Sequence, residues 1–118
     1  MYDSILDALR RGAVAEALTA AEALAAERPD DPQALRWLST SQMQGGQPEA
    51  ALATIDRAIA LAPDNADLHL ARAGVLVGSR RNEDAQAALS QATVLDPNQF
   101  TAYVIQGQLA LGRGDLDE

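Results

Sequence analysis

The stretch that decides the fold is GQPEAALATIDRAIALAP, residues 46–63, whose pattern returns along the chain at a fixed spacing. Pro48 suits the first turn of a helix, where its missing N–H costs no hydrogen bond, and Pro63 lies just beyond the expected end. Between the two prolines, small and aliphatic residues recur at spacings of three and four, which gives one apolar face. We therefore predict a helix whose start and end are both marked in the sequence.

The pattern of this stretch returns 34 residues later in the chain and, in part, 34 residues earlier. Small residues match small ones, and aliphatic residues match aliphatic ones. The later matches are Ala51 with Ala85, Ile55 with Leu89, Ala58 with Ala92, Leu61 with Leu95 and Pro63 with Pro97. The earlier matches are Gly46 with Gly12, Ala51 with Ala17 and Pro63 with Pro29. A helical period of this length is typical of a solenoid, in which helix pairs stack on one another.

The composition of the 118 residues favours thin, closely packed helices over a bulky globular core. Hydrophobic residues make up 47% of the chain, but aromatic residues make up only 3%. The formal net charge is −8 and the sequence pI is about 4.4. Because positive charge drives binding to phosphates, we expect neither nucleic acid nor an anionic membrane as the main partner.

Several classes of enzyme site lack the residues that they need. All nine basic residues are Arg, which excludes a Schiff-base Lys and a Walker-type phosphate loop. The absence of Cys excludes thiol catalysis, disulfides and thiolate metal sites. His69 is the only histidine, and we expect it to pack between helices. Five acidic residues stand at expected helix starts or between repeats, where caps and partners of the helix dipole are expected: Asp30, Asp31, Asp64, Asp67 and Asp96. We predict no enzymatic activity, no cofactor and no metal.

Neither a secretory signal nor a membrane span is predicted. The first residues, MYDSILDALRRG, mix acids and bases and have no apolar core. No stretch approaches the roughly 20 apolar residues that a helix needs to cross a bilayer. We expect a cytoplasmic protein, or a periplasmic one if the sequence is cut from a longer exported chain.

We expect seven helices joined by short connections, which force neighbouring helices to lie antiparallel. Prolines and glycines mark most of the ends, because the residue before a proline is pushed out of the helical conformation. Asp31, either Asp64 or Asn65, and Asn82 are the expected N-caps of the third, fifth and sixth helices. The expected helices span about residues 4–11, 13–28, 32–44, 48–62, 66–77, 83–95 and 98–111.

These repeats resemble the tetratricopeptide repeat, whose 34-residue pattern places large and small residues at set positions of two helices. Residues 32–65 carry the pattern in Leu35, Ser39, Gly46, Gln47, Ala51, Ile55, Ala58 and Pro63. Residues 66–99 carry it in His69, Ala73, Arg80, Arg81, Ala85, Leu89, Ala92 and Pro97. Residues 100–118 supply Tyr103, Gly107, Gly114 and Asp115. The resemblance covers nearly the whole chain.

The resemblance implies an all-α fold, a right-handed superhelical solenoid of antiparallel helix pairs that forms a single domain over residues 1–118. This domain would comprise a partial or capping repeat at 1–31, repeats at 32–65 and 66–99, and a truncated repeat at 100–118. Ala51 and Ala85 would let the two helices of a repeat approach closely, and Ala58 and Ala92 would lie where repeats meet.

One turn departs from the family pattern, and the last residues match it. Arg80 stands where the turn usually has Gly, so we expect a reshaped turn with Gly78 as a relief point. Residues 114–118, GDLDE, match the start of another second helix. With the Ala- and Arg-rich composition, this indicates a fragment of a longer bacterial protein or a product trimmed to this boundary.

In tetratricopeptide proteins, the first helices of the repeats line a concave groove. Carried over position by position, the resemblance assigns to this groove Gln33, Arg36, Trp37, Thr40, Met43, Gln44, Asp67, Leu70, Ala71, Gly74, Val77, Gly78, Thr101, Val104, Ile105, Gln108, Leu111 and Gly112, with Tyr2, Leu6 and Leu9 from the first partial helix. The assigned groove is apolar and rimmed by Arg36 and Asp67, which suits an amphipathic helix or an apolar extended segment. Trp37 is the expected anchor. The alternative is that Trp37, Met43 and Leu70 pack on a neighbouring repeat or the N-terminal helix.

One subgroup of the family grips the acidic C-terminal tails of heat-shock chaperones with Lys and Asn at set groove positions. Here those positions hold Arg36, Thr40, Ala71, Thr101 and Ile105. The clamp of two basic residues is therefore absent, and we expect no recognition of such tails.

The predicted function is a non-enzymatic scaffold for protein–protein interaction that binds a peptide or helix in an apolar concave groove. Two alternatives remain open. The chain could be the N-terminal adaptor domain of a larger multidomain bacterial enzyme, or a self-association module that forms homo-oligomers through the groove or the C-terminal edge.

Overall fold

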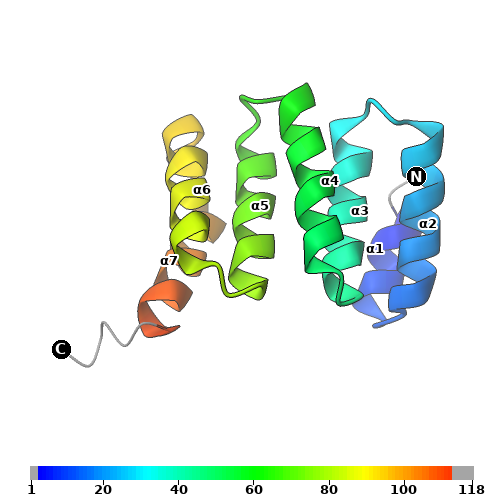
Figure 1. Ribbon diagram of the computed structural model, residues 1–118, viewed down its shortest axis with the longest axis horizontal. Coiled ribbons are helices and arrows are strands. Elements are labelled where there is room, and N and C mark those ends of the chain that lie inside the picture. Colours follow the sequence, from blue (N-terminus) through cyan, green and yellow to red (C-terminus); the bar gives the residue numbers. More distant parts are fainter. Residues whose placement is uncertain (1–2, 113–118) are drawn as a thin grey trace. The chain divides into compact units, whose positions relative to one another are not determined.

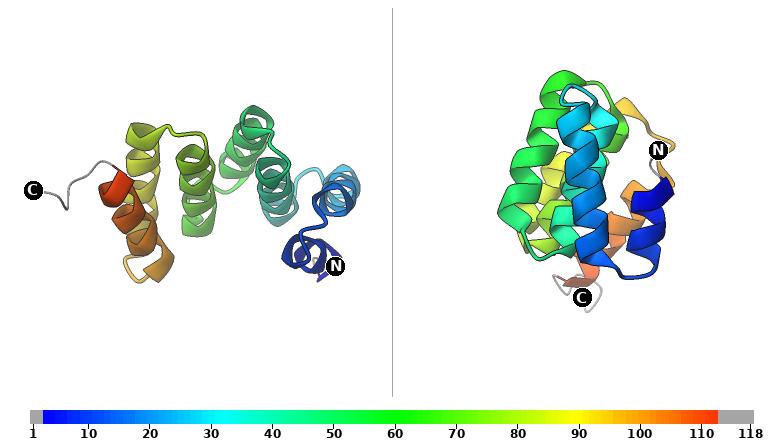
Figure 2. Two further views of the ribbon diagram at one scale, coloured as in Figure 1. Left: turned by 90° about the horizontal axis from the view of Figure 1, so that it is seen from below. Right: turned by 90° about the vertical axis from the view of Figure 1, so that its right-hand side faces the viewer.

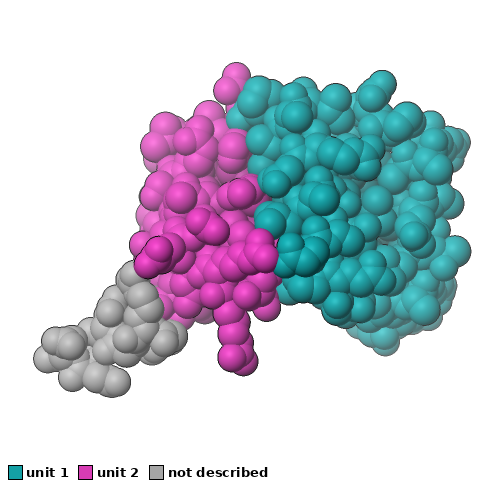
Figure 3. Space-filling model, viewed as in Figure 1, with its two compact units in different colours: residues 1–63 teal, residues 64–118 magenta. Residues whose placement is uncertain are grey.

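The computed structural model describes residues 3–112, and for residues 110–112 it describes the backbone alone. Within this range the chain forms seven α-helices and no β-strand (Figure 1). The helices fall into two compact units, Met1–Pro63 and Asp64–Glu118 (Figure 3). The predicted repeat boundary between residues 65 and 66 lies just after the division between the units.

The first unit contains four helices: α1 (Asp3–Arg10), α2 (Val14–Glu27), α3 (Pro32–Gln44) and α4 (Pro48–Leu61). Each helix packs on the next one in the chain. The connections are short, so neighbouring helices run antiparallel (Figure 1). The bounds of α3 agree with the prediction, and the other helices differ from their predicted ranges only at their ends.

The second unit contains α5 (Ala66–Gly78), α6 (Asn82–Leu95) and α7 (Phe100–Gly112). α5 and α6 form an antiparallel pair, and α7 packs on α6 and contacts α5 (Figure 2). α7 begins two residues later than predicted. The reason is a turn before the helix, in which the backbone N–H of Asn98 donates to Oδ1 of Asp96 at 3.0 Å.

Two of the predicted N-caps are confirmed and one is wrong. Asp31 accepts a hydrogen bond from the backbone N–H two residues later at 2.9 Å, and Asn65 does the same at 3.0 Å. Asn82, by contrast, is the first residue of α6, and Arg81 precedes it without a side-chain cap. The start of α6 is therefore set by the backbone of the preceding turn.

Small residues set the closest contacts within the helix pairs. All four alanines of the repeat pattern are completely buried: Ala51, Ala58, Ala85 and Ala92. In the α3–α4 pair, the buried Oγ of Ser39 donates a hydrogen bond to the backbone carbonyl of Ala51 at 2.8 Å. A larger side chain at either position would force the two helix backbones apart.

The same turn follows the first helix of three successive pairs. Gly12, Gly46 and Arg80 all have positive φ, at 73°, 75° and 64°. After each of them a backbone N–H closes the turn on the preceding helix, from Ala13 to Ala8, from Gln47 to Gln42 and from Arg81 to Leu76, at 2.8 to 2.9 Å. The expectation of a reshaped turn relieved by Gly78 is therefore wrong. The hydrogen bonds and packing of the turn outweigh the roughly 1–2 kcal/mol that a left-handed conformation costs an Arg.

Candidate functional site

The residues assigned to the groove share one property: wherever the structure describes their side chains, none is buried. The half-buried ones are Leu6, Leu9, Gln33, Arg36, Trp37, Thr40, Met43, Leu70, Ala71, Val77 and Ile105. The exposed ones are Gln44, Asp67, Gly74, Gly78, Thr101, Val104 and Gln108. Tyr2 lies outside the described residues, as do the side-chain positions of Leu111 and Gly112 and the GDLDE segment. The assigned residues form one surface in each unit, and we describe the two surfaces separately.

The first surface lies on α3 and centres on Trp37. One part of this side chain packs against a buried cluster formed by Ile5, Ala21, Leu24, Ala34 and Leu38. Leu9 of α1 packs on the same cluster. Trp37 is only half-buried, so part of its ring stays accessible. The expected alternative, packing with the N-terminal helices, is thus present, and the role of Trp37 as a binding anchor stays a prediction.

Arg36 adds a positive charge to this surface. Its guanidinium carbon lies 5.1 Å from the centroid of the Trp37 ring, within the range of a cation–π contact. The Nε of Arg36 is buried and has no hydrogen-bond partner among the described residues. None of the ion pairs of the described chain involves Arg36. The surface therefore carries a cation that no acidic side chain of the described chain neutralises.

Two hydroxyl groups of α3, those of Thr40 and Ser41, are satisfied within their own helix. Oγ1 of Thr40 donates to the backbone carbonyl of Arg36 at 3.1 Å, and Oγ of Ser41 donates to that of Trp37 at 2.9 Å. Met43 lies half-buried one turn further on. Besides Arg36, the accessible part of this surface offers the apolar side chains of Trp37 and Met43 and the amide groups of Gln33 and Gln44.

The second surface is carried by α5 and α7, which contact each other. Leu70, Ala71 and Val77 are half-buried on α5. On α7, Ile105 is half-buried and Val104 is 44% exposed. Apolar side chains thus remain partly open to solvent on both helices.

Asp67, at the rim of this surface, is held by two hydrogen bonds. Its backbone N–H donates to Asn65, and its Oδ1 accepts a hydrogen bond from Nε2 of Gln99 at 2.6 Å. Gln99 directly precedes α7, so the bond joins the starts of α5 and α7. The sequence analysis missed Gln99. The only sequence signal that could have pointed to Gln99 is the repeat, because Gln99 stands 34 residues after the cap Asn65. Its side chain is one methylene longer than that of Asn65, and it reaches Asp67 on α5.

Arg11, beside the turn between α1 and α2, pairs with two nearby carboxylates. Arg11 lies 3.1 Å from Glu16 and 3.0 Å from Asp7, and hydrogen bonds to these carboxylates raise the pKa of Arg11. His69 is half-buried on α5. Within residues 3–112, no group of three His, Asp or Glu side chains is placed to hold a metal ion. No described helix combines the length and the apolar character needed to cross a membrane.

Comparisons with known sequences match most of the chain. The tetratricopeptide repeat family matches residues 2–66 and, with a second family description of the same name, residues 42–111. A comparison with curated proteins gave no match.

Similar solved structures include a mutant O-GlcNAc transferase from Thermobaculum terrenum, with 29% identity and a TM-score of 0.77 over 87% of this chain and 21% of that one. They also include TTC0263, a thermophilic TPR protein of Thermus thermophilus, with 27% identity and a TM-score of 0.86 over 96% of this chain and 63% of that one. The first TPR of Spaghetti (RPAP3), bound to an HSP90 peptide, has 15% identity and a TM-score of 0.81 over 95% of this chain and 89% of that one, and shows the fold alone. This chain spans 21% of the transferase and 63% of the Thermus protein. The helices and these structures together confirm the predicted all-α, TPR-like solenoid fold.

Proposed function

This chain belongs to the tetratricopeptide repeat family, and we propose that it is a non-enzymatic scaffold for protein–protein interaction. It binds a peptide or helix of a partner protein on the residues of α3, α5 and α7 that were assigned to the groove, which we call the groove register. One observation carries the proposal: apolar residues of the groove register stay partly open while their neighbours are buried. On α5, Leu68 and Leu76 are 0% and 1% exposed, whereas Leu70 and Val77 are only half-buried. Apolar surface left open along a helix is typical of a site that takes an apolar partner segment.

The charge on α3 indicates a partner segment that combines apolar side chains with a carboxylate. Arg36 has no acidic partner in the described chain and lies over Trp37. A carboxylate of the partner would pair with the guanidinium, while an apolar side chain would contact the open part of the Trp37 ring. An amphipathic helix, or an apolar extended segment with one acidic residue, meets both requirements.

The Spaghetti structure, which holds an HSP90 peptide, supports a peptide as the class of partner. The chaperone-tail positions in this chain are nevertheless occupied by Arg36, Thr40, Ala71, Thr101 and Ile105. We therefore propose a different recognition chemistry, in which apolar contacts dominate and a single Arg supplies the charge.

The decisive experiment places a bulky charge on the surface of α5. A Cβ built on Gly74 would meet no atom within 4 Å, so a larger residue fits the fold there. The chain is used as bait for affinity capture with quantitative mass spectrometry, and a peptide of the captured partner is then titrated while Trp37 fluorescence is followed. We expect Gly74→Glu to lose the partner.

Ala87→Glu is the matched control, because it adds the same charge at an exposed small residue of α6, a helix that carries none of the residues assigned to the groove. We expect this variant to retain the partner. Equal capture by the wild type and by Gly74→Glu would contradict the proposal. Trp37→Phe, which keeps an aromatic ring on the core, tests the anchor. Its peptide affinity is measured by titration calorimetry because this variant contains no Trp, and an unchanged affinity would remove Trp37 from that role.

A second candidate function is that of an adaptor region in a larger multidomain bacterial enzyme. The observation that favours it is the 29% identity with the Thermobaculum terrenum transferase, of which this chain spans 21%. The helices would then position a partner for a catalytic domain elsewhere in the same protein. The complete reading frame of the gene decides this: a frame that encodes no catalytic domain would contradict the candidate.

A further inference from the structure

We infer that the second surface, carried by α5 and α7, binds an Arg side chain of the partner segment, with the carboxylate of Asp67 as its acceptor. The inference rests on the proposed function and deepens it, because it names the charge that the partner brings to this surface. Asp67 thereby adds a negative charge to the positive one that Arg36 supplies on α3. Gln99 is a positioning residue, which holds the carboxylate in place.

The carboxylate of Asp67 is open to solvent and has no cationic partner in the described chain. Asp67 is an exposed residue near the start of α5, and none of the ion pairs of the described chain includes it. Its Oδ1 accepts one hydrogen bond, from Gln99, and its Oδ2 accepts none among the described residues. A carboxylate offers about four lone-pair positions. Most of this capacity is therefore left for a donor from outside the chain.

Two hydrogen bonds fix Asp67 in position before any partner arrives. Its backbone N–H donates to Oδ1 of the cap Asn65 at 3.0 Å, and Nε2 of Gln99 donates to its Oδ1 at 2.6 Å. The second bond crosses from the start of α7 to the start of α5, so the carboxylate is held from both helices. An acceptor that is already fixed loses less conformational freedom when a partner docks.

The amide of Gln99 holds Asp67 although its own oxygen stays unpaired. Its Oε1 is buried and has no hydrogen-bond partner among the described residues. An unpaired buried acceptor destabilises a fold, so its presence needs an explanation. The reverse orientation of the amide would bring Oε1 against the carboxylate of Asp67, where two acceptors repel each other. The observed orientation is therefore the one that fixes the carboxylate.

Apolar side chains continue the face of α5 that carries Asp67. Leu70 and Ala71 follow it by three and four residues, which places them on the same side of the helix, and both are only half-buried. On α7, Val104 is 44% exposed. The second surface therefore combines one fixed carboxylate with open aliphatic contacts.

These features suit an Arg better than a Lys. The guanidinium group is planar, donates two parallel hydrogen bonds to a carboxylate and is less strongly hydrated than an ammonium group. The aliphatic stem of the Arg would lie along Leu70 and Ala71. The net charge of −8 also favours the approach of a positively charged segment. The occupant of this surface is therefore an apolar segment that carries an Arg.

Selection from a phage-displayed library of random peptides, with the whole chain as bait, tests the inference. We expect the wild type to enrich apolar peptides that contain Arg, and Asp67→Asn to lose this preference. The substitution removes the charge but keeps the shape and the acceptor for Gln99. Asp84→Asn is the matched control, because Asp84 is likewise an exposed acid in the first turn of its helix and lies on α6, outside the groove register. It should enrich Arg as the wild type does.

The outcomes separate this inference from the function on which it rests. If the wild type enriched apolar peptides with no preference for Arg, the inference would be overturned and the peptide-binding function would stand. A preference for Lys over Arg, or a preference for Arg that survives in Asp67→Asn, would also overturn the inference alone. If the wild type enriched no peptide, both would fall.

An enriched peptide, synthesised once with Arg and once with citrulline, then measures the contact by titration calorimetry. Citrulline has nearly the same shape as Arg but carries no charge. For the wild type we expect the citrulline peptide to bind about three- to tenfold more weakly, which is the effect of one partly exposed ion pair. For Asp67→Asn the two peptides should bind equally. Equal binding of the two peptides by the wild type would overturn the inference.

Gln99→Leu tests the positioning role, with circular dichroism to confirm that the variant is folded. Without the amide, the carboxylate of Asp67 is free to rotate. The advantage of Arg over citrulline should therefore shrink, while the affinity of the citrulline peptide stays that of the wild type. If both affinities fell and their ratio stayed the same, Gln99 would support only the fold, and its positioning role would be overturned.

Discussion

α5 and α7 are built on the same repeat positions, one period apart, and yet they bury different residues. Both helices bury one equivalent side, as shown by Leu68 on α5 and Ala102 on α7, which are both 0% exposed. Ala73 on α5 is also 0% exposed, whereas Gly107 at the same position of α7 is exposed, and Tyr103 beside it is 50% exposed. The difference is α6, which packs on α5 in the way that no described helix packs on the side of α7 that carries Tyr103 and Gly107, its outer face. In a repeat, burial is therefore conferred by the next helix and not by the residue's own hydrophobicity.

The largest effect that this comparison predicts concerns Leu89, which is completely buried in α6. Leu89→Ala should lower the free energy of unfolding by about 2–5 kcal/mol, because it leaves a cavity in the buried contact of α6 with its neighbours. Tyr103→Ala on the open face of α7 should cost about 1 kcal/mol or less, since it mainly removes one exposed hydrogen bond. That bond runs from the Tyr103 hydroxyl to the backbone carbonyl of Pro97 at 2.9 Å. Urea unfolding followed by circular dichroism measures both, and equal losses would break the comparison.

A second prediction compares the effect of a larger side chain in the closed contact between α5 and α6 with its effect on the open side of α7. Ala85→Leu should lower the free energy of unfolding by about 1–3 kcal/mol, because Ala85 is completely buried where α6 meets α5. Gly107→Leu should cause no loss, because the space around Gly107 is open. Thermal melting of the two variants is the measurement. If Ala85→Leu melted as the wild type does, the assignment of repeat positions would be wrong.

The helices were predictable because their signals are local. Pro32 and Pro48 mark the starts of α3 and α4, and Asp31 and Asn65 cap their helices through hydrogen bonds that span two residues. The period then indicated which alanines face another helix, because each repeat position has the same neighbour in every complete pair. These features depend on short spacings in the chain, which a sequence displays directly.

The features that escaped prediction depend on contacts between distant segments. Trp37 was the expected anchor, with packing on a neighbouring repeat or the N-terminal helix as the alternative, and the choice depended on its contact with a cluster that includes Ile5 of α1 and Leu24 of α2. The bond between Gln99 and Asp67 joins residues 32 positions apart. The cap Asn82 was misplaced because the turn before it kept the glycine-type geometry with Arg80. In the candidate surfaces, the sequence indicated the helix face, and the structure showed which charges lack partners.

A third prediction sharpens the comparison of α5 with α7 at one position. Gly107→Ala should raise the free energy of unfolding by about 0.8–1 kcal/mol, because Ala has a higher helix propensity than Gly and a Cβ meets no atom there. The variant would make this position of α7 identical to Ala73 on α5. Chemical denaturation followed by circular dichroism measures the gain. A loss of stability would show that the outer face of α7 is occupied in the free protein.

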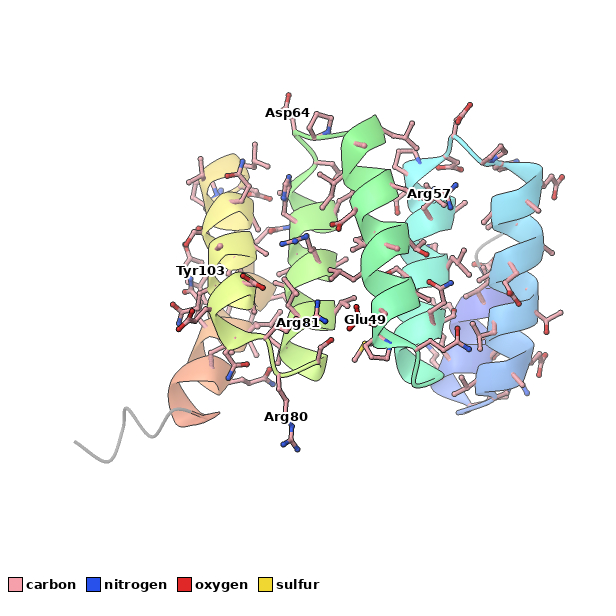
Figure 4. All side chains as sticks on the ribbon, viewed as in Figure 1. Glu49, Arg57, Asp64, Arg80, Arg81 and Tyr103 are labelled. Carbon is pink, nitrogen blue, oxygen red and sulfur yellow. The ribbon has the colours of Figure 1, made fainter. Side chains whose placement is uncertain are left out.

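The smallest expected effect concerns the turn between α5 and α6, where the backbone is the same as in the other pairs and only the residue differs. Arg80 has φ 64°, close to the 75° of Gly46, and its side chain extends away from the helices (Figure 4). Relief of the left-handed conformation by Arg80→Gly is worth about 1–2 kcal/mol. The greater freedom of Gly in the unfolded chain offsets about 0.5–1 kcal/mol of this, so the net gain in stability should be about 0.5–1 kcal/mol.

Gly46→Ala provides the reverse substitution, because a Cβ at Gly46 meets no atom within 4 Å and only the backbone conformation opposes it. It should lower the free energy of unfolding by an amount similar to the gain at position 80, about 0.5–1 kcal/mol. Trp37, the only Trp, lies in the first unit and reports the unfolding of that unit by fluorescence, while circular dichroism follows all the helices. If Arg80→Gly were destabilising while Gly46→Ala behaved as expected, the Arg80 side chain itself would stabilise the turn, and the equivalence of the two turns would be limited to their backbones.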